Sequence, residues 1–214
     1  MIYKIYLVDG DSGILMIENT FKAFSKGKNL EPDLLTGFFQ AVNSMIDDIQ
    51  FAMAKGRRIN DMNRIVAGED STIVIYYHPL SRVLFCSISD ADDDKERLIE
   101  ILRKIGSRFW KKHQRDLKNF RTTSNKNEFE SFDTDIDVLS MGGHAAEILP
   151  KLIVAKSALE RIKSMGMITK EEVEIAMLCD GENSPLQISR DTESLESEIR
   201  DILKKLENLD IIKY

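Results

Sequence analysis

The spacing of apolar residues changes along this chain of 214 residues, and this change constrains the fold more than any other feature. Residues 2–8 form a short run rich in β-branched and aromatic types, which favour strands. Asp9-Gly10-Asp11-Ser12-Gly13 then supplies residues typical of tight turns, and a second apolar run covers residues 14–17. A run, a turn and a second run predict a β-hairpin at the start of the chain.

A helix is predicted after the hairpin. Pro32 suits the first helical position, where its missing N–H costs nothing. Apolar residues then recur at steps of three and four, which indicates a buried helical stripe. The stripe consists of Leu35, Phe38, Val42, Met45 and Ile49.

Three more strands are predicted after this helix, weakly over 59–66, strongly over 72–77, and over 82–88. His78-Pro79-Leu80-Ser81 forms the turn between the last two. The order of strands and helices predicts an α+β domain over residues 1–142, with a five-stranded antiparallel sheet and its helices on one side. This would be a two-layer, profilin-like arrangement.

Two helices are predicted to complete this domain. Asp90 to Asp94 open a long helix, because acidic groups are favoured near the positive end of the helix dipole. Its apolar seam runs through Leu98, Leu102, Ile105 and Phe109. A shorter stripe, ending at Gly142-Gly143, consists of Phe129, Phe132, Ile136 and Leu139.

A second, small all-α unit is predicted over residues 143–214. Pro150 marks the start of a helix, and Thr169 with Glu172 forms a capping box at the start of the next. A last helix precedes a final strand at 210–214. The first helix has the stripe Leu152, Ala155, Leu159 and Ile162, and the last has Leu195, Ile199, Ile202, Leu203 and Leu206.

Charge is distributed unevenly along the chain, whose net charge is −6. Residues 1–121 carry 19 basic and 17 acidic groups, whereas residues 122–214 carry 11 and 19. The acidic charge of residues 122–214 argues against binding of nucleic acid by this part of the chain, because such binding depends on Lys and Arg. Cys86 and Cys179 lie far apart and are interpreted as buried thiols of a reducing compartment. With no signal peptide or membrane-length apolar run, a cytoplasmic location is expected.

The order of the elements over residues 1–142 resembles the longin and roadblock superfamily. Two segments carry this resemblance together with the element order. They are the hairpin Val8-Asp9-Gly10-Asp11-Ser12-Gly13-Ile14 and the tail Phe109…Leu117…Phe129…Phe132…Ile136…Leu139. Because the chain begins with a strand, the longin order is favoured over the roadblock order. The resemblance implies a non-enzymatic platform that binds a small GTPase, belongs to a vesicle-trafficking complex, or dimerises through a sheet edge or helix.

The end of the chain resembles a winged helix, whose last helix leads through a Leu-rich stretch into a first wing strand. Residues 202–212 carry this resemblance. The chain stops at Tyr214, so the usual second wing strand is missing. From Glu193 to Glu207 the last helix holds five acidic and three basic residues, and phosphate would repel it. Protein–protein contact is therefore the preferred role.

One helical face is a candidate binding surface. Five basic residues share it beside Trp110, namely Lys104, Arg108, Lys111, Arg115 and Lys118. They would suit an acidic protein partner, anionic lipid or RNA. The alternative is an ordinary solvated face opposite the apolar seam.

No catalytic, cofactor-binding or metal-binding residue is predicted. Neither Asp9/Asp11 nor the run from Asp90 has calcium-loop spacing, and turn and cap roles explain both. The three histidines, His78, His113 and His144, lack a partner at ligand spacing. The sequence contains no nucleophile elbow and no glycine-rich phosphate loop. A catalytic triad can still form from residues that meet only in the fold.

The sequence therefore predicts a cytosolic adaptor or scaffold that binds a small GTPase or a trafficking-like complex through the first domain. The second unit would be a further docking or dimerisation element, in a homo- or heterodimer, and the basic helix a peripheral contact with anionic membrane. A winged-helix transcriptional regulator on duplex DNA is the alternative. A hydrolase with a pocket and a shifted His or Cys is a third reading.

Overall fold

A computed structural model of the chain describes residues 1–23, 35–41, 44 and 62–214. They form two compact units, Met1–Ala146 and Glu147–Tyr214. Four residues of the predicted first helix, Pro32, Val42, Met45 and Ile49, lie outside the described residues. Among the helices of the described ranges, none is both long enough and apolar enough to cross a bilayer.

The first unit is built on a five-stranded antiparallel sheet, which confirms the predicted α+β class. Its strand order is β2-β1-β5-β4-β3, so that β1, β5 and β4 lie inside and β2 and β3 lie at the edges. The strands are β1 (Ile2–Asp9), β2 (Leu15–Thr20), β3 (Met62–Ala67), β4 (Ser71–His78) and β5 (Val83–Asp90).

The hairpin turn between β1 and β2 is anchored to the turn between β4 and β5. The Gly10 amide donates to the Arg82 carbonyl oxygen at 2.8 Å. A Cβ on residue 10 would lie 2.6 Å from the same oxygen, so only glycine allows the two turns to approach this closely.

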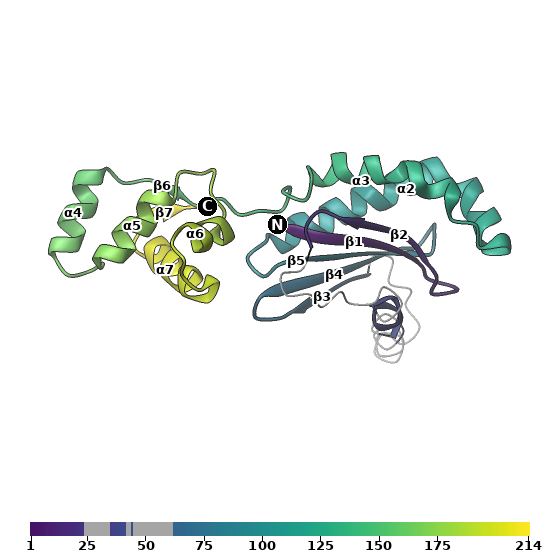
Figure 1. Cartoon of the computed structure of the whole chain (residues 1–214), viewed down its shortest axis with the longest axis horizontal. Coiled ribbons are helices and arrows are strands. Elements are labelled where there is room, and N and C mark those ends of the chain that lie inside the picture. Colours follow the sequence, from purple (N-terminus) through teal and green to yellow (C-terminus); the bar gives the residue numbers. More distant parts are fainter. Residues whose placement is uncertain (24–34, 42–43, 45–61) are drawn as a thin grey trace. The chain divides into compact units, whose positions relative to one another are not determined.

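Helices cover both faces of this sheet (Figure 1). Ile5 and Leu7 pack toward α2 (Lys95–Thr123), η1 (Asn127–Phe132) and α3 (Asp133–Ser140). Tyr6 and Val8 point the other way and share a core with Leu35 and Phe39 of the helical residues 35–41. The prediction of a two-layer domain with helices on one side is therefore wrong. Its physical reason is that β1 is buried on both faces, and each face requires an apolar cover.

The helical segment on the second face buries different residues from those predicted. Leu35 is buried, as expected, but Phe38 is 40% exposed, and Phe39 is fully buried in its place. The rings of Phe39 and Tyr6 lie 5.7 Å apart between centroids. A step of four from Leu35 reaches Phe39, so the predicted stripe was displaced by one residue at this point.

Helix α2 approaches the other face closely and changes direction on the way. Gly106 lies against the sheet, where a Cβ would come within 3.1 Å of Tyr76 and 3.2 Å of Phe85. The backbone leaves helical geometry at His113, with φ −117° and ψ 17°. The helix therefore consists of two parts, which are joined at a buried histidine.

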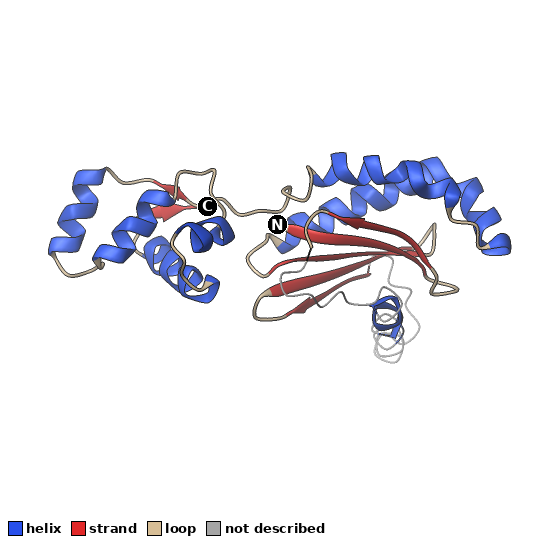
Figure 2. Cartoon of the chain, in the orientation of Figure 1, coloured by secondary structure: helices blue, strands red, loops and turns tan. Residues whose placement is uncertain are grey.

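The second unit combines helices with a small sheet (Figure 2). Its elements are β6 (Lys151–Leu152), α4 (Lys156–Ser164), α5 (Lys170–Leu178), α6 (Pro185–Asp191), α7 (Glu196–Asn208) and β7 (Ile212–Lys213). Strands β6 and β7 pair antiparallel, and Lys151 also bridges to Asp180. The prediction of an all-α unit is therefore wrong.

The helix predicted from Pro150 begins only at Lys156. The Leu152 amide donates to the Cys179 carbonyl at 2.7 Å, and the Ile153 amide donates to the Ile211 carbonyl at 3.0 Å. Because these bonds go to distant segments, residues 151–153 are extended, and Leu152 contributes to the core from a strand. The apolar spacing alone does not distinguish this from a helical turn.

The capping box at the start of α5 is confirmed. The Glu172 amide donates to Thr169 Oγ1 at 3.1 Å, and the Thr169 amide donates to Glu172 Oε2 at 2.8 Å.

The boundary between the units lies four residues beyond the predicted one. The Gly143 carbonyl accepts from the Ile2 amide at 2.7 Å, and the Ala146 carbonyl accepts from the Asp94 amide at 2.9 Å. These bonds hold residues 143–146 on the first unit, and Ala146 lies in its core.

Candidate functional site

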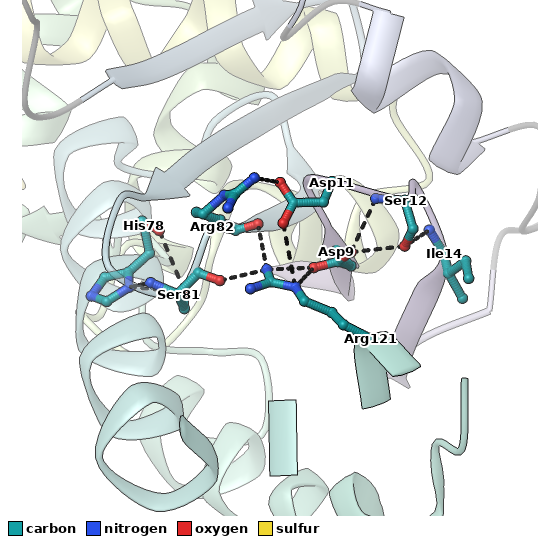
Figure 3. Close-up of polar contacts among 8 residues, drawn as sticks. All are labelled: Asp9, Asp11, Ser12, Ile14, His78, Ser81, Arg82 and Arg121. Atoms are coloured by element: carbon teal, nitrogen blue, oxygen red, sulfur yellow. Dashed lines mark hydrogen bonds and ion pairs between the residues drawn. The ribbon is translucent and has the colours of Figure 1, made fainter. Parts of the chain in front are cut away.

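A buried carboxylate, Asp9, lies at the centre of the main polar cluster of the first unit (Figure 3). Its Oδ1 accepts from Arg121 Nε at 2.9 Å and from Arg121 Nη2 at 2.6 Å. Its Oδ2 accepts from the Ser12 amide at 3.0 Å and from Ser12 Oγ at 2.8 Å. Both oxygens are therefore occupied by hydrogen-bond donors.

Arg121 extends this cluster to the two neighbouring turns. Its Nη2 also donates to the Ser81 carbonyl at 2.8 Å, and its Nε lies 3.4 Å from Asp11 Oδ2. Asp11 forms a second ion pair, with Arg82. The cluster thus joins the last turn of α2 to the β1–β2 and β4–β5 turns. Sequence reasoning assigned Asp9 and Asp11 to a turn but missed Arg121, which is 112 residues away.

A small cavity of about 250 Å³ opens beside the cluster, lined in part by Ser12, Ile14 and Phe120. Ser12 Oγ, the hydroxyl that faces Asp9, also accepts from the Ile14 amide at 3.3 Å. Because the carboxylates and guanidinium groups are paired with one another, the arrangement fixes the fold and offers neither a free nucleophile nor an unpaired charge to a ligand.

A serine–histidine pair occurs in the β4–β5 turn. His78 Nδ1 lies 2.9 Å from Ser81 Oγ and accepts from the Ser81 amide at 3.2 Å. Ser81 is fully buried, and His78 is nearly so. Such a pair resembles part of a nucleophilic site, but burial keeps a substrate away from the hydroxyl. Its role is to shape the turn.

The histidine at the bend of α2 lies in a cage of aromatic rings. The His113 ring centroid lies 5.4 Å from that of Phe109, 5.6 Å from Phe129 and 5.5 Å from Phe132. Its Nδ1 is 2.8 Å from Asp116 Oδ2. His113 therefore joins α2 to η1 through these ring contacts.

The predicted basic face of α2 separates into two groups. Lys104 pairs with Glu100 at 2.7 Å, and Arg108 Nε donates to Asp135 Oδ1 of α3 at 2.9 Å. Lys112 also pairs with Asp135. Burial acts to raise the pKa of Asp135, but hydrogen bonds from Lys112 and Arg108 hold it below the usual value.

The remaining predicted residues, Lys111, Arg115 and Lys118, are exposed, and within the described ranges none of them forms an ion pair. The bend at His113 falls between Lys111 and Arg115. Trp110, predicted beside the face, packs partly buried against the apolar core. The free cationic part of the face is therefore smaller than the sequence indicated.

Two exposed apolar side chains at the edge of the sheet were not predicted from the sequence. Ile65 and Val66 of the outer strand β3 are 43% and 39% exposed. Both lie in the strand predicted most weakly, and no periodic pattern distinguished an exposed apolar residue from a core one. An outer strand with such side chains is a natural place for a second chain to pair.

The carboxylates before α2 have the predicted cap and turn roles. Asp94 Oδ1 accepts from the Arg97 amide at 3.0 Å at the helix N-terminus, and Asp90 Oδ1 accepts from the Asp92 amide at 3.1 Å.

Both cysteines are free and buried, as predicted. Burial raises the pKa of both thiols, that of Cys179 to about 12.

Comparison with protein-family models found no match, and comparison with curated proteins found none either.

Proposed function

We propose that this chain is a non-enzymatic cytosolic adaptor, which binds a small GTPase or a subunit of a trafficking-like complex through its first unit. The observation that carries the proposal is the exposed apolar pair Ile65 and Val66 on the outer strand β3. A partner strand added there would gain main-chain hydrogen bonds and would cover part of each side chain, one on either face of the sheet.

The polar groups of the first unit favour binding over catalysis. Asp9 is fully occupied by Arg121 and Ser12, and Ser81 is buried beside His78. A general base or nucleophile needs access to a substrate atom. In the described part of the unit these groups instead brace its turns, which favours a rigid platform.

The order of elements agrees with the resemblance to longin domains. In the described part of the first unit, two strands are followed by helical residues 35–41, three strands and the three helical elements α2, η1 and α3. Members of that superfamily are platforms for small GTPases and trafficking complexes. Fold likeness alone is a weak guide to function, and the edge strand therefore carries more of the argument.

The free basic residues of α2 provide a second contact. Lys111, Arg115 and Lys118 would face an acidic partner surface or anionic lipid headgroups. Such contacts chiefly raise the association rate and are weakened by salt.

Affinity capture from native cytosol tests the proposal. Tagged full-length protein and the double variant Ile65→Lys/Val66→Lys are each incubated with cytosol to which GDP or a non-hydrolysable GTP analogue has been added. We expect recovery of a small GTPase in one nucleotide state, and its loss with the double variant. A control is Leu80→Lys, which makes the same type of substitution at one exposed apolar residue in the β4–β5 turn. Equal recovery of the GTPase by the original protein, the double variant and the control would refute the role of the edge strand.

A DNA-binding regulator is the alternative, and the second unit, with its helices and small sheet, is where it would act. Lys205, one of the three basic residues of α7, is engaged by Glu172 at 2.8 Å, which weakens this alternative. Binding to duplex DNA that decreases steeply with salt would support the regulator and overturn the adaptor.

A further inference from the structure

The second unit carries a surface groove of about 760 Å³ between α5 and the turn that joins α6 to α7. This volume falls in the range of about 300–1,000 Å³ that is typical of ligand-binding sites. Except for Ile175, the lining residues are at least partly exposed, so the groove is open along the surface and not an enclosed cavity.

Apolar side chains of α5 form part of its wall. Val173 and Met177 are four residues apart and therefore lie on the same side of the helix. Val173 and Leu178 are half-buried, whereas Met177 is 37% exposed. A methionine side chain is flexible and polarisable, so it adapts to the shape of an apolar partner.

Acidic side chains surround this apolar wall. Glu171, Glu174 and Asp191 line the groove together with one base, Lys170. Lys170 Nζ lies 3.6 Å from Glu174 Oε1, and both groups are largely exposed. The lining therefore has a net negative charge, which attracts cationic groups.

We propose that this groove binds a basic amphipathic helix of a partner protein. Apolar side chains of that helix would contact Val173, Met177 and Leu178, and its flanking Lys or Arg residues would face Glu171, Glu174 and Asp191. This is the usual way in which an amphipathic helix occupies a groove.

Charge argues against the second unit of another copy as the occupant. Residues 147–214 carry ten Lys and Arg against fourteen Asp and Glu, so two such units would repel each other at an acidic groove. The proposal is independent of the edge strand of the first unit, since all lining residues belong to the second.

Selection from a displayed peptide library tests this proposal on the full-length protein. The library contains random helical peptides of about 15 residues, near the length at which isolated helices become stable. We expect enriched peptides to carry apolar residues at steps of three and four and a net positive charge. Their affinities are then measured by fluorescence polarisation.

Two groove variants locate the binding. Met177→Asp removes the exposed apolar contact, and Glu171→Lys/Glu174→Lys reverses the charge of the lining. Each is expected to lower the affinity for the selected peptides about tenfold or more. With the charge reversal, added salt should no longer lower the affinity. Controls are Met165→Asp and Glu160→Lys, which make the same types of substitution at single exposed positions outside the groove. Amide hydrogen exchange of the second unit checks that each variant is folded.

Several outcomes overturn the proposal. They are the absence of an enriched peptide family, enrichment of acidic or neutral peptides, and peptides that bind Met177→Asp as well as the original protein. Self-association that Met177→Asp abolishes would assign the groove to a second copy. The variant Ile65→Lys/Val66→Lys should bind the peptides normally, so failure here and failure of the proposed adaptor role are separable.

Discussion

In each unit a buried carboxylate holds a helix in place, and the two carboxylates, Asp9 and Glu172, do so differently. Asp9 of the first unit is fully buried and receives two hydrogen bonds from Arg121 and two from Ser12. Glu172 of the second unit is mostly buried and receives its bonds from the Thr169 amide and Lys205. The first contact depends on a tertiary arrangement, whereas half of the second is a local helix cap. We therefore expect the first unit to be more sensitive to loss of its cation.

The largest effect is expected for Arg121→Met. It leaves the Asp9 carboxylate buried without its cation, which typically costs about 3–5 kcal/mol of unfolding free energy. Amide hydrogen exchange in the first unit measures the loss, because the two units need not unfold together. Arg115→Met is the matched control on the same helix, and it should change stability by less than about 0.5 kcal/mol. Equal effects of the two substitutions would show that the Asp9 cluster contributes nothing specific.

A smaller loss is expected for Lys205→Met in the second unit. Lys205 is partly exposed, and Glu172 keeps its bond from the Thr169 amide, so we expect a loss of about 1 kcal/mol. Exchange of the α5 amides measures it. Lys204→Met, at the exposed neighbouring position, should have almost no effect. A loss as large as that of Arg121→Met would remove the distinction between the two carboxylates.

Acid should weaken the second unit through Glu172. Burial acts to raise the pKa of this carboxyl, but hydrogen bonds from Lys205 and Thr169 lower it below the usual value of 4.5. A lowered pKa in the folded state contributes stability that is fully present above pH 4.5 and is lost as the pH falls through the folded pKa. Glu172→Gln should flatten this part of the acid dependence, measured by exchange of the α5 amides. If Glu172→Gln left the acid dependence of α5 exchange unchanged, Glu172 would not be the group responsible.

The smallest effect concerns the two thiols, which we expect to be unreactive in the folded protein. Burial raises the pKa of Cys86 and of Cys179, and only the thiolate reacts with alkylating reagents. Mass spectrometry after timed alkylation should show each cysteine modified only as its own unit opens. Arg121→Met should then speed alkylation of Cys86 and leave Cys179 unchanged. Equal acceleration of both would indicate that the units unfold together.

Local signals in the sequence predicted the features that depend on neighbouring residues. Thr169 and Glu172 are three residues apart, and their capping box is present as predicted. The turn residues from Asp9 to Gly13 close the first hairpin, and the five strands form the expected antiparallel sheet.

Features that depend on distant residues were missed or misplaced. Pairing of residues 151–153 with Cys179 and Ile211 overrides the helical spacing of Leu152 and Ala155. The bonds between Asp9 and Arg121 join positions that no periodicity relates. The basic face of α2 was predicted from helical geometry alone, and its ion pair with Asp135 of α3 arises only in the fold. The exposure of Ile65 and Val66 likewise depends on β3 being an outer strand.

The pairing of β6 with β7 determines how the second unit would respond to tension. Lys151 is opposite Lys213 and Leu152 is opposite Ile212, so the chain enters and leaves this unit at the same end of an antiparallel pair. A pulling force applied to residues 151 and 213 would load these hydrogen bonds one after another, as in opening a zipper, and not all at once. A chain fused after Tyr214 would depart beside the point where the unit is attached. The pulling force would then act mainly on the β6–β7 pair and little on the helices.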